Sequence, residues 1–173
     1  MVTNQIKTKE AANETTPASQ IERNQFNRSQ RSNNKLSDPS IRKLFEGKNF
    51  AFVSSIMKDG YPQVTPTWVD IENGNILVNT VIGKLKHKNI SRDPRVALAI
   101  ADQNDPYDMV TIRGRTVEQI TGDAAEEHID KLVEKYIGKD KYPGRSPAEK
   151  RVILKIKPEN VFHMNYKKQV SKT

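Results

Sequence analysis

Two tight-turn signals lie close together in this chain, and they constrain its fold more than any other feature. Asp59-Gly60 and Asn73-Gly74 are dipeptides that tolerate positive φ and join antiparallel strands. The segments around them read as strands: residues 50–57 are strongly apolar, residues 62–71 form the return strand, and residues 75–81 form the third. We therefore expect a three-stranded antiparallel meander.

The rest of the chain supplies more strands than helices. Four further strand patterns follow, at residues 95–101, 108–120, 151–156 and 161–166. Most connections are short. A parallel doubly wound sheet needs helices that alternate with its strands and a glycine-rich phosphate loop, and the sequence has neither, so this fold is excluded. We expect a mainly β protein with small α-helices: a closed or split β-barrel of six to seven antiparallel strands with peripheral helices.

Three helices are predicted around this barrel. Ser37 or Asp38 can cap the first, and its apolar residues fall on one face before Gly47 ends it. The clearest helix starts near residues 121–123 and ends at Gly138. Its apolar stripe has helical spacing and consists of Ala125, Ile129, Leu132, Val133 and Tyr136.

Proline and glycine mark special positions within the strands. Pro66 cannot donate to a ladder, so it indicates an edge strand, a bulge or a place where something else lies alongside. Gly114 is expected to form a bulge. Residues 102–107, which contain Pro106, are predicted to be a loop, and Pro158 is predicted to separate the last two strands.

Charge and composition suggest three regions. The chain has 173 residues, a net charge of +8 and no cysteine, which excludes disulfides and thiolate metal sites. Residues 1–34 are polar and read as a disordered basic tail, residues 35–166 as the folded domain, and residues 167–173 as a second basic tail. No run is long and apolar enough to span a membrane, and the N-terminus has no signal-peptide core, so we expect a cytoplasmic protein.

A short basic helix after residues 76–81 is the strongest binding signal. It follows Gly83 and is stopped by Asp93-Pro94. Its first N–H groups and its dipole favour an anion, whereas Lys84, Lys86 and Lys88 add cations where they are unfavourable. A bound phosphate would relieve this conflict. A solvated basic helix explains the pattern equally well.

Several motifs together resemble one family. They are Pro66-Thr67-Trp68-Val69, Asn79-Thr80, Lys86-His87-Lys88-Asn89-Ile90, Arg92-Asp93-Pro94-Arg95-Val96, the loop Tyr136 to Pro143, and Arg151. Over roughly residues 36–166 the chain resembles the pyridoxamine 5′-phosphate oxidase-like (FMN-binding split barrel) superfamily, and within it the branch of F(420)-dependent oxidoreductases.

The resemblance implies a homodimer with two cofactor sites at its interface, and either coenzyme F(420) or FMN as cofactor. Lys86 occupies the position of the family's phosphate-binding lysine, and Lys84 is a second phosphate contact. The implied cofactor-binding residues are Thr65, Pro66, Thr67 and Trp68 beside the ring, with Asn79, Thr80, Lys84, Lys86 and Asn89 toward the phosphate. The chain has Leu85-Lys86 where pyridoxamine phosphate oxidases proper have an Arg-Lys pair, which argues against pyridoxamine phosphate as substrate.

Catalytic residues do not stand out. The histidines at 87, 128 and 163 lack metal-ligand spacing, and no hydrolase triad is present, so no metal is expected. Tyr142 and His87 are candidate proton donors, with structural roles as the alternative. The expected activity is hydride transfer to or from a small unsaturated substrate. A non-catalytic flavin or deazaflavin carrier or sensor is the main alternative, and a nucleic-acid-associated barrel, supported only by the tails, is a third. No membrane partner is expected.

Overall fold

The computed structural model describes residues 35–165, so the two predicted tails lie outside the described residues. The helices are α2 (Pro39–Glu46), α3 (Leu85–Arg92) and α4 (Asp123–Ile137). The strands are β1 (Ala51–Ile56), β2 (Pro62–Thr67), β3 (Asp70–Glu72), β4 (Asn75–Val81), β5 (Arg95–Asp102), β6 (Asp105–Thr121) and β7 (Arg151–Asn165). No helix in the described range is long and apolar enough to cross a membrane.

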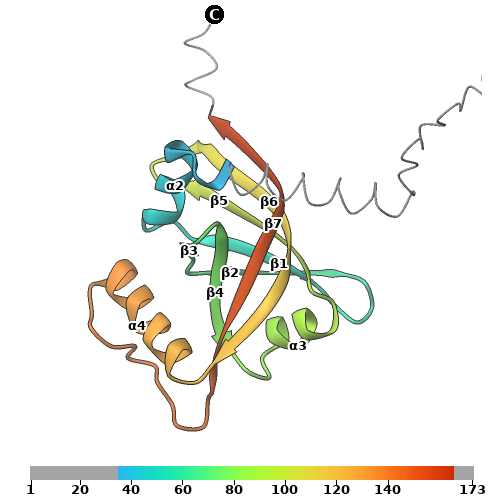
Figure 1. Ribbon diagram of the computed structural model, residues 1–173, viewed down its shortest axis with the longest axis vertical. Helices are drawn as coiled ribbons and strands as arrows, with labels where there is room; N and C mark the ends of the chain where they lie inside the picture. Colours follow the sequence, from blue (N-terminus) through green and yellow to red (C-terminus); the bar gives the residue numbers. More distant parts are fainter. Residues whose placement is uncertain (1–34, 166–173) are drawn as a thin grey trace, which may run out of the picture.

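All seven strands belong to one antiparallel sheet with the order β2-β1-β5-β6-β7-β4-β3. The outermost strands, β2 and β3, are separated along the chain only by Trp68 and Val69. The two edges of the sheet therefore lie next to each other, and the sheet curls into a barrel that stays split between them (Figure 1). The predicted mainly β split barrel is confirmed.

The helices flank the two ends of this barrel. Helix α2 lies at one end, whereas α3 and α4 lie on either side of the other end (Figure 1). Asp38 caps α2 by accepting from the Ser40 N–H at 2.8 Å, as predicted. Gly138 ends α4 with a φ of 67°, and all five residues of the predicted α4 stripe are buried.

The predicted three-stranded meander is wrong, because the return segment breaks at Trp68-Val69. Strand β2 pairs only with β1, and β3 pairs only with β4. Val69 is fully buried, and its N–H donates to the hydroxyl of Tyr136 on α4 at 3.2 Å instead of to a strand. The Tyr136 hydroxyl thus satisfies the backbone donor at the point where the segment breaks. Pro66 lies on the edge strand β2, as its missing donor requires.

Two further boundaries differ from the sequence expectation. The predicted loop at 102–107 is a tight turn at residues 103–104, because β6 already begins at Asp105. The last two predicted strands are one continuous strand, β7, in which Pro158 pairs opposite Gly114 where the register of β6 and β7 shifts. A proline at a bulge removes no regular ladder bond, so it does not end the strand. The predicted bulge at Gly114 is confirmed.

Gly114 provides the first stability prediction. A Cβ at this position would lie 2.5 Å from the Lys157 carbonyl oxygen on β7, a backbone atom that cannot move alone. Gly114→Ala should therefore destabilise the protein by about 1–3 kcal/mol, the usual cost of overpacking. Urea unfolding measures this difference. Ala97→Gly is a matched control on β5, because it removes a methyl group without a clash; equal effects of both variants would contradict the steric argument.

Candidate functional site

Helix α3 carries the lysines that the sequence selected, and they occupy different environments. Lys84 is the N-cap residue, with no side-chain cap, and forms an ion pair with Glu149 at 2.7 Å. Lys86 is only 7% exposed and has no hydrogen bond or ion pair to any described residue. Burial lowers the pKa of Lys86 from its ordinary value to about 8. Lys88 is exposed. Among these three cations, Lys86 is therefore the one that is both desolvated and unpaired.

Asn89 anchors α3 to the barrel. Its side chain is 2% exposed and donates to Ser55 Oγ on β1 at 3.2 Å. Ser55 Oγ donates in turn to Gln63 Oε1 at 3.2 Å, and Gln63 Nε2 donates to Thr65 Oγ1 at 2.5 Å. This chain of side chains links α3 with the edge strand β2, and thus the basic helix with the segment predicted to flank a ring.

A pocket opens between the end of β2, strand β4 and helix α4. Its volume is ≈ 350 Å³, near the lower end of the range for ligand pockets. Trp68 forms one wall and stacks on Tyr136 with ring centroids 5.3 Å apart and planes at 13°. The lining residues are Phe50, Pro66, Thr67, Trp68, Asn79, Ile129, Leu132, Tyr142 and Arg151.

A second hollow, of ≈ 380 Å³, lies on the outer face of the sheet. The α4 pocket is the one that contains predicted site residues. Four of them (Pro66, Thr67, Trp68 and Asn79) come together in its wall. The structure does not bring the α3 lysines into this wall.

Tyr136 supports the pocket from behind. Its hydroxyl donates to the Asn49 carbonyl oxygen at 2.7 Å and accepts from the Val69 N–H. Burial raises the pKa of Tyr136 to about 12. The Tyr136 hydroxyl is therefore a structural link between α4 and the split edges of the barrel. The Tyr136 ring stacks on the Trp68 ring and holds it in place.

Asn79 contributes a buried carboxamide to the pocket wall. Its side chain is 7% exposed. The Nδ2 atom donates to the Ala125 carbonyl oxygen at 2.8 Å and lies 3.4 Å from His128 Nδ1. The Oδ1 atom is buried without a hydrogen-bond partner in the described part of the chain. An unpaired buried acceptor costs about 1–3 kcal/mol, so this oxygen is an unmet requirement for a donor.

Thr80, although adjacent in sequence, lies on the opposite face of β4. It pairs with Val152, which belongs to the core inside the barrel, whereas Asn79 pairs with Ile153, which packs against α4. The two residues therefore cannot serve one ligand from the same side of the sheet. The predicted site residues thus divide into an α4 group and a group that faces the barrel interior or α3.

Arg151 and Tyr142 complete the pocket. Neither is among the cofactor-binding residues predicted from the sequence. The Arg151 guanidinium lies 4.3 Å from the centroid of the Tyr142 ring. No ion pair joins Arg151 to an acidic residue among residues 35–165. Tyr142, a candidate proton donor with a loop anchor as the alternative, donates its backbone N–H to Asp130 Oδ1 at 2.9 Å, which anchors the loop. The alternation of β7 places Arg151 on the same face as Ile153, and that signal was readable in the sequence.

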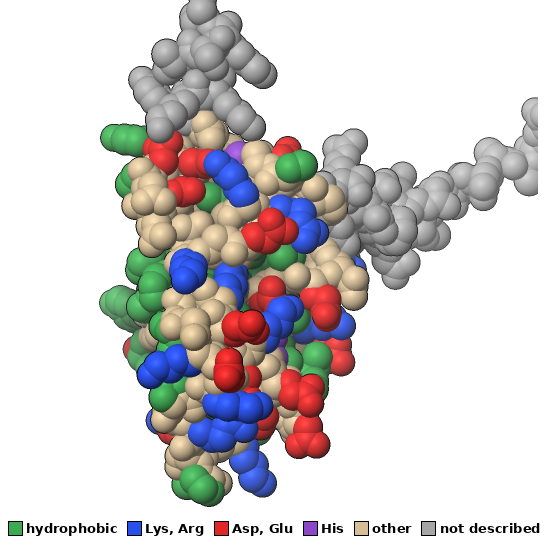
Figure 2. Space-filling view, turned by 90° about the vertical axis from the view of Figure 1, so that its left-hand side faces the viewer, with side chains coloured by type: hydrophobic (Ala, Val, Ile, Leu, Met, Phe, Trp, Pro, Cys, Tyr) green, Lys and Arg blue, Asp and Glu red, His purple; other side chains and the backbone are tan. Residues whose placement is uncertain are grey.

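Acidic and basic side chains are balanced around α4. Asp70 accepts from Lys131 at 2.6 Å and lies 3.7 Å from His128 Nε2. Burial alone would raise the pKa of Asp70, but His128 and Lys131 outweigh it and hold the pKa below its ordinary value. Figure 2 shows Lys and Arg intermixed with Asp and Glu over the face that carries α4.

His87, the other candidate proton donor, accepts from the Gly83 N–H at 3.1 Å at the start of α3.

The fold and the pocket define the class as a split β-barrel with a ligand-sized pocket at its α4 side. A model of the pyridoxamine 5′-phosphate oxidase family matches residues 37–165. This match spans most of the 173-residue chain, and the chain therefore belongs to this family.

Solved structures agree with this fold. An F(420) reductase is 24% identical, with a TM-score of 0.61, and the alignment covers 70% of this chain and 94% of that protein. A conserved hypothetical protein of Mycobacterium tuberculosis is 22% identical, with a TM-score of 0.63 and coverage of 77% and 87%. HupZ of Group A Streptococcus is 19% identical, with a TM-score of 0.53 and coverage of 72% and 90%. No curated protein matches.

Proposed function

We propose that this protein is an oxidoreductase that binds a phosphate-bearing flavin or deazaflavin, FMN or coenzyme F(420), and transfers a hydride to or from a small unsaturated substrate. Lys86 is the observation that carries the proposal. A lysine that is buried, unpaired and placed in the first turn of a helix is costly unless an anion joins it. Phosphate fits this requirement, because the N-terminus of α3 has no side-chain cap and the first N–H groups of a helix favour an anion.

The remaining predicted residues are compatible with a ring beside β2. Thr65 is fixed by Gln63, and Thr67 and Trp68 end the strand at the α4 pocket. When bound, the cofactor would supply the hydride chemistry. The residues of this chain would bind the phosphate at Lys86, orient the ring along β2 and exclude water with Trp68.

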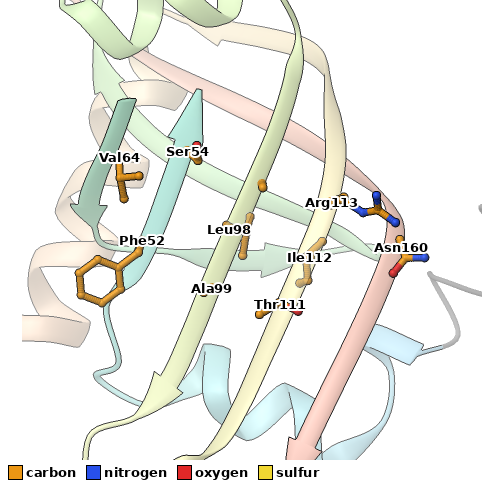
Figure 3. Close-up of a pocket in the computed structure, with 10 residues that line it drawn as sticks. Phe52, Ser54, Val64, Leu98, Ala99, Thr111, Ile112, Arg113 and Asn160 are labelled. Atoms are coloured by element: carbon orange, nitrogen blue, oxygen red, sulfur yellow. The ribbon is translucent and has the colours of Figure 1, made fainter. Parts of the chain in front are cut away.

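The outer face of the sheet favours a second copy of the chain as partner. A hollow of ≈ 380 Å³ lies across β1, β2, β5 and β6, with small residues at its floor (Figure 3). Phe52 is 51% exposed and Phe162 is 57% exposed. Ala97 and Ala99 leave room on this face for a large side chain. A symmetric dimer would cover it with the same surface of the partner and would shield the edge strand β2.

Ala97→Arg tests this dimer. A charged side chain in the floor of the hollow should prevent association and give a monomer in sedimentation experiments at micromolar concentration, where the wild type should have about twice the chain mass. Val117→Arg is the control, because Val117 is also an exposed apolar residue but does not line the hollow. A monomeric wild type that binds cofactor would disprove the dimeric site.

The function itself is tested with purified cofactors. FMN and F(420) should each be titrated into the full chain, and the one that binds should then be used in its reduced form with activated alkenes, quinones and tetrapyrroles. Turnover would support the oxidoreductase. Tight binding without turnover would favour the carrier or sensor, which is consistent with the engaged Tyr136 hydroxyl beside the pocket. Absence of binding by either cofactor would refute the proposal.

A further inference from the structure

The α4 pocket combines a flat aromatic wall with an apolar side. Trp68 forms the flat wall, with Tyr136 stacked behind it, and α4 adds Ile129 and Leu132. Because Tyr136 is held at its hydroxyl by two backbone groups, this wall is rigid. A volume of ≈ 350 Å³ accommodates a planar group of one or two rings.

The one cation among the lining residues, Arg151, forms no ion pair within residues 35–165, although it contributes, after Lys84, to the lowered pKa of Glu149. Arg145, in the same loop region, pairs with Asp130 at 2.7 Å, and Lys141 pairs with Asp130 at 3.0 Å. Lys84 takes Glu149. Arg151 has no such ion pair within residues 35–165, and its guanidinium is instead positioned on the Tyr142 ring. A guanidinium fixed in this way presents its N–H groups to a carboxylate with little loss of side-chain entropy.

An acceptor that lacks a donor lies in the same wall. Asn79 pairs with Ile153 across β4 and β7, and Arg151 is two residues before Ile153 on the same face of the sheet. Diagonal neighbours of this kind have Cα atoms about 7–8 Å apart. Asn79, whose Oδ1 has no hydrogen-bond partner within residues 35–165, and Arg151, which forms no ion pair there, therefore line neighbouring parts of one pocket.

The geometry points to a ligand that is a flat, conjugated carboxylate with an N–H or O–H donor near its carboxyl group. The carboxylate would bind Arg151, the donor would satisfy Asn79 Oδ1, and the ring would lie against Trp68. The inference deepens the proposed function, under which this ligand is the substrate. Binding at the pocket, however, can be measured without cofactor or turnover.

Indole-2-carboxylate is a suitable probe, because its ring N–H lies beside its carboxylate. Trp68 is the only tryptophan of the chain, so its indole N–H gives one resonance in a proton–nitrogen NMR spectrum of the labelled full chain. Titration should shift this resonance saturably. The methyl ester, which lacks the charge, and the N-methyl derivative, which lacks the donor, should each bind at least about tenfold more weakly.

Variants assign the two contacts. Arg151→Gln should weaken indole-2-carboxylate about ten- to hundredfold and leave the methyl ester nearly unchanged, and Arg151→Lys should recover part of the loss. Asn79→Leu should reduce the preference for the free N–H over the N-methyl derivative. Arg42→Gln, at an exposed position on α2 at the other end of the barrel, is the control and should change nothing.

The wild-type titrations decide the inference even if a variant fails to fold. An unshifted Trp68 resonance, equal binding of acid and ester, or equal losses in Arg151→Gln and Arg42→Gln would overturn it. Failure of FMN and F(420) to bind, with the probe still bound at Trp68, would refute the proposed function but leave this pocket assignment standing.

Discussion

Lys86→Ala should weaken binding of the cofactor about ten- to hundredfold, because it removes a charge-assisted contact worth about 1.5–3 kcal/mol. The Lys86 side chain is buried at the start of α3 and forms no ion pair with a described residue. In the variant, a bound anion would therefore lose its charged partner. Fluorescence titration with FMN and with F(420) measures the change. Lys88→Ala is the matched control on the same helix, because Lys88 is exposed.

The pH dependence gives an independent check. Without cofactor, the pKa of Lys86 is about 8, so its charge is lost as the pH rises through that value and affinity should fall on the alkaline side. This fall should be absent in Lys86→Ala. The folded pKa lies below the unfolded value of about 10.4. The folded protein therefore binds fewer protons than the unfolded chain between these values, and the cofactor-free wild type should gain stability as the pH rises from 8. At neutral pH, cofactor-free Lys86→Ala should melt slightly higher than the wild type.

Equal, small losses of affinity in Lys86→Ala and Lys88→Ala would place the phosphate elsewhere and reduce the basic helix to a solvated surface. A wild-type affinity that is flat across pH 8 would argue the same.

Asp108→Asn should produce the largest loss of stability, about 2–3 kcal/mol, because it weakens two charge-assisted contacts of a buried carboxylate. Asp108 is 2% exposed. It pairs with Lys43 of α2 at 2.5 Å and with His163 Nε2 of β7 at 2.8 Å. Together these contacts fasten α2 to the barrel. Urea unfolding at pH 7 measures the loss.

The same carboxylate predicts an acid dependence. Burial raises the pKa of Asp108, but hydrogen bonds from Lys43, His163 and Asn165 outweigh it, and the pKa lies below its ordinary value. The stabilisation is fully present above the unfolded pKa of about 3.9 and is lost as the pH falls through the folded pKa. The difference between wild type and Asp108→Asn should therefore shrink below about pH 4. Glu46→Gln, which breaks an exposed ion pair on α2, should cost less than about 1 kcal/mol; a similar loss in both variants would contradict this account.

Local signals in the sequence determined most of the elements. The caps of α2, the end of α4 at Gly138 and the turn at Asn73-Gly74 depend on residues next to one another, so the chain order alone reveals them. The basic helix was also readable, as was its stop before Pro94. The alternation of β4 places the neighbours Asn79 and Thr80 on opposite faces of the sheet.

Only the tertiary structure decided where the return strand breaks and which residues share a pocket. The break at Val69 depends on the hydroxyl of Tyr136, 67 residues further along the chain. Packing between distant segments desolvates Lys86 but not Lys88. It also places Asn79 and Arg151 in the wall of one pocket. Burial and the loss of hydrogen-bond partners depend on those contacts, and no local pattern encodes them.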